Sequence, residues 1–468
     1  MKHSSILFTI AGGLLVSSCA FFGNYERNDE RIAEVTKNLY RDPVNPQGVL
    51  AIEDSTSFGN TPWREVFTDP LLQGYIETAL EQNYDIRKLD NTLQTVEIAL
   101  RLSKFAYLPQ IALSPSGTIS KVFDMGADNS KTYSIPVQAS WQIDVWGTMR
   151  NTLKQANLQR EQAILGRQAA QTGIICGVAN VYYGLQMLDQ QRNITESTLA
   201  IWKKQIEIME AYKEVGYTNS AAIASARAQV LSIESSLVTI GGKQRELENS
   251  LCLLLGEAPH AIERSAFTAE GFPTEYSTGY PLALLANRPD VAIAESKLAY
   301  ATYGVMKARG QMCPQLSING QGQYTNSLGA MIVNPGKFIA AGIANLVQPI
   351  FARGQLLGNL KMSKIDLENA QLDFEKTLIT AGQEVSNALS SYHGAEELID
   401  ISTEQVAELQ KAHDDTEFLF HNGNTTTYLE ILSAQMNLLQ AQLGLINNRY
   451  SKVVAAITLY QALGGGSN

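Results

Sequence analysis

The sequence repeats its own pattern after about 205 residues, and this duplication limits the possible folds more than any other feature. The interval drifts only slightly along the chain. It separates Pro109 from Pro314 and Asp144–Gly147 from Pro349–Ala352 by 205 residues, Ala228–Gln229 from Ala434–Gln435 by 206, and Leu255–Gly256 from Leu463–Gly464 by 208. Such drift fits a few single-residue insertions between two similar halves.

Each half predicts the same order of elements: a helix, a strand hairpin and two long helices. The first half gives a helix from Asp69-Pro70 that Pro109 stops, strands 111–122 and 133–147, and helices 150–213 and 221–255, the last with Ser220 as its expected cap. The second half gives helix 289–312, strand 316–325, loop 326–337, strand 338–348, and helices 355–420 and 427–463. A proline-free helix of about sixty residues reaches roughly 90 Å, which indicates a tubular or coiled-coil-like assembly.

The clearest strand is 133–147, where apolar and uncharged polar residues alternate. About ten residues with a period of two can cross a bilayer as a tilted strand. The same alternation also describes a half-buried strand in a soluble sheet. Two hairpins give four strands, which cannot close a barrel, so a membrane barrel would require several chains; three chains would give twelve strands.

The N-terminus is a targeting segment, with a short apolar run after Lys2 and His3. Val16-Ser17-Ser18-Cys19 resembles a bacterial lipobox, so we expect a signal peptide over 1–18 and a lipid on Cys19. An ordinary signal peptide with an incidental cysteine is the alternative. No later segment offers about eighteen uninterrupted apolar residues, so a membrane crossing would have to use strands.

Composition argues against several function classes. The net charge is −10 and no basic run occurs, which argues against a nucleic-acid partner. The four cysteines form no CxxC pair, and no set of nucleophile, base and orienting group is recognisable. His413, Glu417 and His421 have metal-ligand spacing on one helix face, although a polar stripe near a helix tip, facing solvent or a bore, explains them better than a metal site does. We therefore expect no enzyme activity, no cofactor and no metal.

Several motifs occur in a characteristic order along the mature chain. They are Trp63–Phe67 with Asp69–Leu72, Leu108–Gln110, Asp144–Gly147, Ala286–Asp290 with Ala294-Glu295, Pro314–Leu316, Gln348–Phe351 and Tyr428–Gln435. Together with the duplication and the lipobox, they resemble the outer membrane efflux protein family, the TolC-like trimeric channels, and within it the lipidated OprM/CusC/NodT-type branch.

The resemblance implies a mainly α fold with a small β part. It implies a homotrimer with a twelve-stranded outer membrane barrel and a periplasmic helical barrel, which conducts substrates passively. The implied partners are a periplasmic adaptor (membrane fusion) protein and an inner-membrane pump of the RND type. The implied domains are a lipid-anchored arm (19–62), a first repeat (63–256), a connector or equatorial region (257–285), a second repeat (286–464) and a short tail (465–468).

The resemblance also implies site residues at the helix tips. Leu429, Glu430 and Ser433 match the positions of the periplasmic gate, with Ser433 standing where relatives commonly carry Asp. The adaptor-contacting turns are Gly216, Tyr217, Thr218, Asn219 and Ser220, and Gly423, Asn424, Thr425 and Thr426. Phe123, Tyr133, Tyr324 and Phe338 flank the hairpin loops, where an aromatic belt would lie.

A different class of protein remains open at this point. A lipid-anchored periplasmic coiled-coil scaffold without a pore would share the long helices and the anchor. The strand hairpins discriminate the two, because a scaffold would cover their apolar faces with protein and a channel would cover them with lipid. The sequence does not distinguish drugs, metal ions, solvents or polypeptides as cargo.

Overall fold

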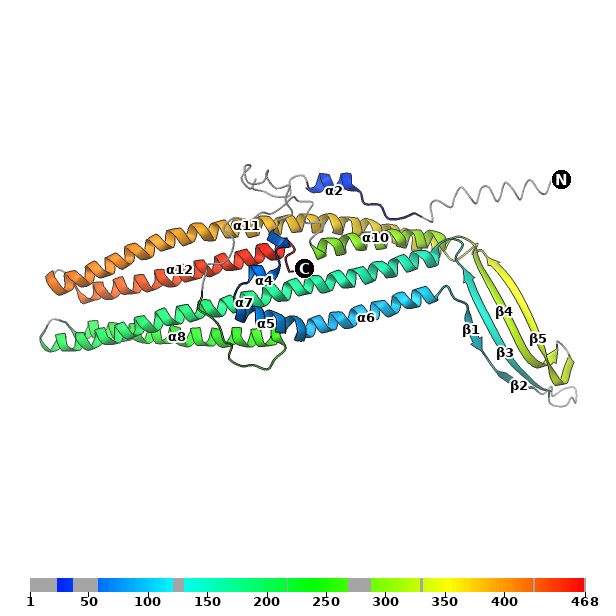
Figure 1. Cartoon of the computed structure of the whole chain (residues 1–468), viewed down its shortest axis with the longest axis horizontal. Coiled ribbons are helices and arrows are strands. Elements are labelled where there is room, and N and C mark those ends of the chain that lie inside the picture. The colour runs from blue at the N-terminus through cyan, green and yellow to red at the C-terminus, as the bar shows by residue number, and fades with distance from the viewer. Residues whose placement is uncertain are drawn as a thin grey trace. The chain divides into compact units, whose positions relative to one another are not determined.

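A computed structural model describes residues 23–36, 58–120, 130–216, 218–267, 288–328, 331–423 and 426–466 (Figure 1). The chain forms two compact units, and the predicted signal peptide and Cys19 lie outside the described residues. The unit we call the sheet unit comprises 1–30, 91–164 and 293–376. The other, the helical unit, comprises 31–90, 165–292 and 377–468.

Helices make up most of the fold, as expected. They are α2 (Asp29–Thr36), η2 (Phe58–Asn60), α4 (Trp63–Val66), α5 (Pro70–Gln82), α6 (Tyr84–Phe105), α7 (Thr148–Glu214), α8 (Ser220–Leu255), α10 (Pro289–Gly310), α11 (Gln355–Gly423) and α12 (Tyr428–Ala462). The predicted long helices are confirmed, with 67 residues in α7 and 69 in α11. Within the described ranges, no helix is both long and apolar enough to span a bilayer.

The sheet contains β1 (Gln110–Leu113), β2 (Ser116–Ser120), β3 (Ser130–Ile143), β4 (Gln315–Leu328) and β5 (Met331–Val347). All pairs are antiparallel, in the order β1-β3-β4-β5, with β2 also pairing with β3. The two halves of the duplication therefore meet at β3 and β4, where Gln138 lies opposite Gln321. The sheet is four strands wide, with β1 and β2 along one edge and β5 along the other.

The prediction of one strand over 111–122 is wrong, because the strand is interrupted at Ser114-Pro115. Proline lacks an amide hydrogen and cannot continue the ladder. Ser114 N still donates to Pro136 O at 3.2 Å, and β1 and β2 keep one register against β3.

The predicted loop 326–337 is also wrong, because β4 continues to Leu328 and β5 begins at Met331. The ladder has an irregularity between Thr325 and Ser327. There the amide of Asn326 replaces main-chain partners: Oδ1 accepts from Tyr133 N at 2.8 Å and Nδ2 donates to Lys131 O at 3.0 Å. Side-chain bonds of this kind keep an irregular ladder satisfied, and sequence alternation does not reveal them.

The predicted single helix from Pro70 to Pro109 is two helices separated at Asn83. Asp69 caps α5 as expected, accepting from Leu71 N at 2.9 Å. Asn83 is buried and extended, and its Oδ1 accepts from Asp85 N at 2.8 Å, which starts α6. Its Nδ2 donates to Leu254 O at the end of α8. The break therefore joins three helix ends.

Two other local predictions need correction. The cap of α8 is Asn219, whose Oδ1 accepts from Ala222 N at 2.9 Å, whereas Ser220 is the first helical residue. The left-handed glycines that precede α7 and α11 are Gly147 (φ 71) and Gly354 (φ 76). They lie 207 residues apart, so the alignment of 144–147 with 349–352 is displaced by two residues.

Candidate functional site

The tips of the two helical hairpins carry most of the candidate residues. Gly216 has φ 81 in the turn after α7. At the second tip, Thr427 N donates to Glu430 Oε2 at 2.8 Å, which supports the first turn of α12. The described tip candidates are Gly216, Thr218, Asn219, Ser220, Gly423 and Thr426; Tyr217, Asn424 and Thr425 lie outside the described residues.

The three gate candidates share one exposed face of α12. Tyr428, Ile431 and Leu432 are buried, whereas Leu429 is 58% exposed and Glu430 and Ser433 are exposed as well. This exposed face is available for contact with another copy of the chain or with a partner protein. Because Glu430 caps its own helix, its carboxylate is held at the helix start, and the face has an apolar residue at 429 and an uncharged one at 433.

An aromatic cluster that the sequence reasoning missed fixes this tip. Phe420 on α11 lies edge-on to Tyr428 at 5.1 Å and to Tyr212 of α7 at 6.1 Å between ring centroids. Tyr428 OH donates to Gln205 O at 3.2 Å, and burial raises its pKa above the usual range. The four residues come from three helices, so only their spacing along each helix could have indicated the cluster.

The predicted metal-spacing residues lie beside this cluster. His413 and Glu417 line a cavity of about 630 Å³ between α7, α11 and α12, and the side chain of His421 is outside the described set. His413 Nδ1 lies 3.2 Å from Asp414 Oδ1. Across the described part of the chain, no group of three His, Cys, Asp or Glu side chains could hold a metal ion.

One face of the sheet is polar where β3 and β4 meet. Ser140 Oγ donates to Asn319 Oδ1 at 2.8 Å, and Gln321 Nε2 donates to Gln323 Oε1 at 2.9 Å. β5 departs from this pattern, because Ile343 lies opposite Asn319 on the same face. The polar face is therefore uncharged and hydrogen-bonded over two strands and apolar over the third.

The opposite face is apolar and exposed. Val137 is 46% exposed and Trp141 is 42% exposed, and the same face includes Ile135, Ile318 and Leu346. Towards the hairpin loops, Tyr133 stacks on Tyr324 at 6.1 Å between centroids, and Phe338 lies opposite Tyr324; Phe123 is outside the described residues. At the helix-proximal end, Trp141 Nε1 donates to Tyr107 O at 2.9 Å. Such a surface has to be covered by lipid or by protein.

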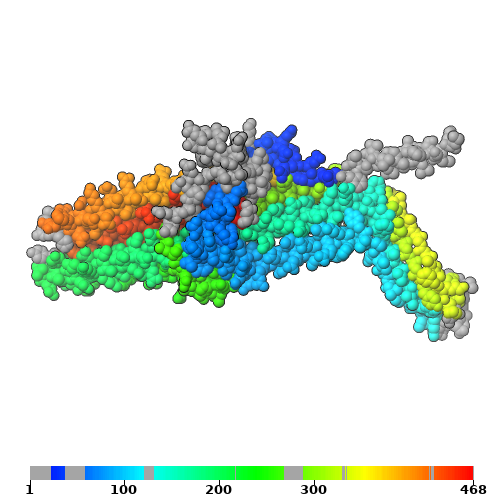
Figure 2. Space-filling view, in the orientation of Figure 1, coloured from blue at the N-terminus to red at the C-terminus, as the bar shows by residue number. Residues whose placement is uncertain are grey.

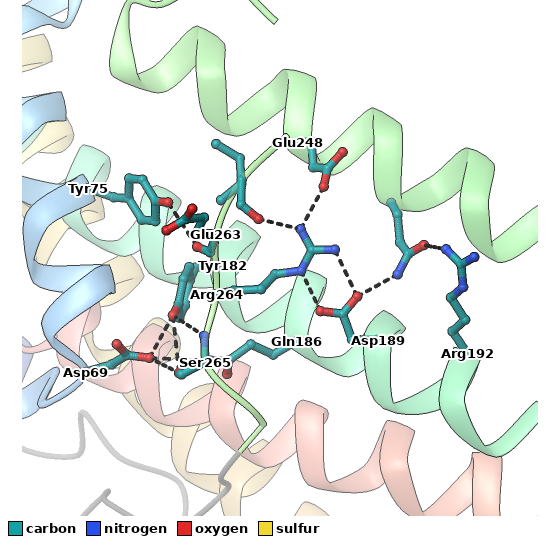
Figure 3. Close-up of polar contacts among 12 residues, drawn as sticks. Asp69, Tyr75, Tyr182, Gln186, Asp189, Arg192, Glu248, Glu263, Arg264 and Ser265 are labelled. Carbon is teal, nitrogen blue, oxygen red and sulfur yellow. Dashed lines mark hydrogen bonds and ion pairs between the residues drawn. The ribbon is translucent and has the colours of Figure 1, made fainter. Parts of the chain in front are cut away.

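A partly buried polar network holds the start of the connector in the helical unit (Figure 3). Asp69 Oδ2 accepts from Tyr182 OH at 2.7 Å and also from Ser265 Oγ. Ser265 N donates to Tyr182 OH at 3.1 Å. The cap of α5 thereby binds both α7 and the connector.

Arg264 extends this network. Its guanidinium donates to both oxygens of Asp189 on α7, Nε at 2.5 Å and Nη2 at 2.9 Å, and to Glu248 Oε1 on α8 at 2.7 Å. Hydrogen bonding to Asp189 outweighs burial and raises the pKa of Arg264 further above its usual value. One connector residue therefore bridges α7 and α8 (Figure 3).

Comparison with known proteins identifies the family to which this chain belongs. The model of the outer membrane efflux protein family matches residues 75–257 and 281–465, one match in each half. The chain belongs to the outer membrane efflux protein family. The predicted family and the mainly helical fold with a small sheet are confirmed.

Relatives of this outer membrane efflux protein support the same conclusion. The toluene efflux pump outer membrane protein TtgC of Pseudomonas putida is 28% identical over 99% of this chain and 96% of TtgC. The cation efflux system protein CusC of Escherichia coli is 26% identical over 97% of both chains. A crystal structure of CusC matches 89% of this chain and 97% of that one with a TM-score of 0.81 and 25% identity. The protein is an outer membrane channel of an efflux system.

Proposed function

We propose that three copies of this chain form one passive duct from the periplasm to the exterior. The observation that carries the proposal is the sheet. Its described strands form a sheet four strands wide, with no strand paired beyond β1 and β2 at one edge or beyond β5 at the other, and one face is apolar and exposed. Free edges do not persist in lipid, so a single copy cannot insert its sheet alone. Three copies supply twelve strands, a suitable number for a closed barrel.

In this proposal the polar face of β3 and β4 lines a water-filled bore. Uncharged amides and hydroxyls such as Gln138, Ser140 and Asn319 can exchange hydrogen bonds with water and hold no substrate tightly. Transport then requires no chemistry by the protein. The helix tips form the periplasmic gate, with Leu429 and Ser433 as its ring residues and Glu430 supporting the turn.

The partners follow from the family. The turns at 216–220 and 423–426 would contact a periplasmic adaptor, and the adaptor would link the duct to an inner-membrane pump of the RND type. TtgC is named for toluene and CusC for cations, and this chain is about equally similar to both. The cargo of this chain is therefore left unassigned.

We further propose that the mature chain begins at Cys19 and carries a lipid there, followed by an arm to residue 62. The two repeats would then span 63–256 and 286–464, joined by the connector. The lipid would attach the chain to the inner leaflet of the outer membrane. The strands would be a second and independent attachment.

The native mass of protein extracted from outer membranes in mild detergent tests this proposal, measured with and without Cys19→Ser. We expect a trimer in both, because the strands close the barrel without the lipid. A monomer, or release of the Cys19→Ser protein into the soluble periplasm, would mean that the lipid was the sole attachment. A periplasmic scaffold without a pore would then be the better description.

A further inference from the structure

The cavity of about 630 Å³ that His413 and Glu417 line lies inside the helical unit, where the first helical hairpin meets the second. Its walls are one face of α7, from Ile194 to Ile208, and the facing parts of α11 and α12. Figures 1 and 2 show the two hairpins side by side, with α7 and α8 in green near the tips and α11 and α12 in orange to red. Small-molecule sites occupy roughly 300–1,000 Å³, and this cavity is of that size.

Two buried polar side chains of the lining lack a hydrogen-bond partner among the described residues. Thr198 of α7 is 4% exposed and Gln435 of α12 is 8% exposed, and both line the cavity. Their polar atoms are not enclosed by protein either, in contrast to Trp202 Nε1 on the same stretch of α7. A buried hydroxyl or amide without a partner is costly unless water or a ligand supplies one. Both side chains are therefore available to a molecule in the cavity.

The charged groups of the lining leave one carboxylate without a countercharge. His413 Nδ1 lies 3.2 Å from Asp414 Oδ1, which also accepts from Gln410 Nε2 at 2.9 Å. Lys204 is exposed, so water and salt screen its ammonium group. Glu417 is half-buried and forms no ion pair with a described cation. The cavity therefore favours a positive charge beside Glu417.

Two aromatic rings lie close to this carboxylate. Phe420 is edge-on to Tyr428 at 5.1 Å between ring centroids, and both residues line the cavity. Burial raises the pKa of Tyr428, and the neighbouring Tyr212 and the charge of Glu417 raise it further, so Glu417 acts directly on this ring. The faces of aromatic rings attract ammonium groups, as carboxylates do. Both features select the same kind of ligand.

We propose that this cavity is a binding site for an amphipathic amine that carries a second polar group. The ammonium group donates to the carboxylate of Glu417 beside the two rings. The apolar body of the ligand lies against side chains such as Ile201 and Leu438, and its second polar group bonds to Thr198 or Gln435. The site lies within the helix walls and is distinct from the polar face of the sheet.

The cavity shares a turn of α12 with the gate residues. Tyr428 and Ile431 line the cavity, whereas Leu429 and Glu430 lie on the exposed face of the same turn. A ligand in the cavity contacts α7 of one hairpin and α11 and α12 of the other, so it stabilises the arrangement in which the hairpins are packed together. The bound amine therefore opposes opening of the tips. This effect, unlike the binding itself, rests on the gate proposed above.

Binding is measured on the purified full chain in nonionic detergent, by the fluorescence anisotropy of naphthyloxypropanolamine. We expect Glu417→Gln to weaken binding about tenfold. Asp415→Asn is the matched control, because it removes an exposed carboxylate of the same helix that does not line the cavity, and it should bind as wild type does. The uncharged naphthyloxypropanediol should not distinguish the three proteins. Equal affinity of the amine for wild type and Glu417→Gln would overturn the proposal.

A second variant fills the cavity. Ser197 lines it and is exposed, and its hydroxyl donates to Asn193 O at 2.8 Å within the same helix, so a larger side chain leaves the buried core intact. We expect Ser197→Trp to abolish binding with an unchanged midpoint of thermal unfolding. Ser236→Trp, the same change at an exposed position of α8 outside this cavity, should retain binding. Full binding by Ser197→Trp would contradict the site.

Single-channel conductance in planar bilayers tests the effect on the gate. The amine should lower the mean conductance of the wild-type protein and have little effect on Glu417→Gln and Ser197→Trp. Equal reduction in all three would mean that the amine blocks the bore, and binding without any reduction would mean that the cavity is not coupled to the gate. Either result would refute the control of the gate. Absence of channels would refute the duct proposed above and leave the binding measurements to decide the site.

Discussion

Asp69 is the residue on which the connector network depends. It caps α5 and accepts hydrogen bonds from Tyr182 and Ser265. We expect Asp69→Ala to lower the stability of the helical unit by about 1–2 kcal/mol, because loss of an N-cap alone costs about that much. The midpoint of thermal unfolding in detergent measures the change. Asp85→Ala, which removes an exposed carboxylate that pairs with Lys88 in the first turn of α6, should have a smaller effect.

The contribution of Asp69 should also depend on pH. Burial raises the pKa of Asp69, but bonds from Ser265, Tyr182 and the α5 backbone outweigh burial and lower it overall. A lowered carboxyl pKa adds stability that is present above the unfolded value of about 4 and is lost as pH falls through the folded value. The difference in midpoint between wild type and Asp69→Asn should therefore shrink below pH 4. A difference that grew on acidification would contradict the network.

A substitution at Gly465 tests how closely the C-terminal residues pack against the ring of Tyr460. A Cβ at this position would stand 2.4 Å from Tyr460 Cε2, in a ring that is fully buried. We expect Gly465→Ala to destabilise the helical unit by about 1–3 kcal/mol, as overpacking does. The matched control is Gly241→Ala in α8, which meets nothing within 4 Å and should stabilise by about 0.5–1 kcal/mol. Similar midpoints for the two variants would show that the C-terminal glycines tolerate side chains.

At the scale of elements, the break at Asn83 is a joint between α5, α6 and the end of α8. Asn83→Ala removes the start of α6 and leaves Leu254 O without its 2.8 Å donor, in a buried place. We expect a loss of about 2 kcal/mol, since an unmade buried hydrogen bond adds to the loss of a cap. Asn91→Ala on the exposed side of α6 is the control for helix propensity. Equal unfolding midpoints for the two variants would contradict a joint at Asn83.

The sequence predicted the long helices, the pairing of a strand hairpin with each half and the family, because proline-free runs, alternation and a repeated order of motifs can all be read along the chain without knowing its contacts. It missed the joint at Asn83, since the apolar spacing continues across that residue and only the distant Leu254 explains the break. It also missed Asn326, whose amide replaces strand bonds across 193 residues of sequence. The tip cluster of Phe420, Tyr428 and Tyr212 was missed because its rings come from three different helices. Contacts between residues far apart in the sequence leave no periodic pattern from which they could be predicted.

At the scale of the whole molecule, the duplication predicts how neighbouring copies would pair. Within one chain, Gln138 of β3 lies opposite Gln321 of β4. Each of these residues has an equivalent in the other half of the chain. Gln138 corresponds to Asn345 on β5, by the 207-residue interval of the left-handed glycines, and Gln321 corresponds to Ser116 on β2, by the 205-residue interval of the prolines. If copies repeat the contact that the halves make, Asn345 lies opposite Ser116 of the next copy.

Paired cysteines test this register. Asn345→Cys with Ser116→Cys, in a Cys313→Ser background, should give disulfide-linked dimers and trimers on non-reducing gels. The control pair is Asn345→Cys with Thr118→Cys, in which the second cysteine lies two residues further along β2 than Ser116. This pair should give little cross-linked product. Stronger cross-linking of the displaced pair in a protein that is still trimeric would show that copies pair in another register. A monomeric protein would instead refute the trimer.

The central pairing of the sheet has a consequence for how the protein is made. β3 and β4 are joined across more than 170 residues, as in the bond between Gln142 and Gln315. When β3 has been synthesised and exported, its partner strand does not yet exist, and one of its edges stays open until the second half follows. Pairing over such separations is slow, and open apolar strands aggregate. The interval between export of β3 and arrival of β4 is therefore the stage at which this chain is most exposed to aggregation.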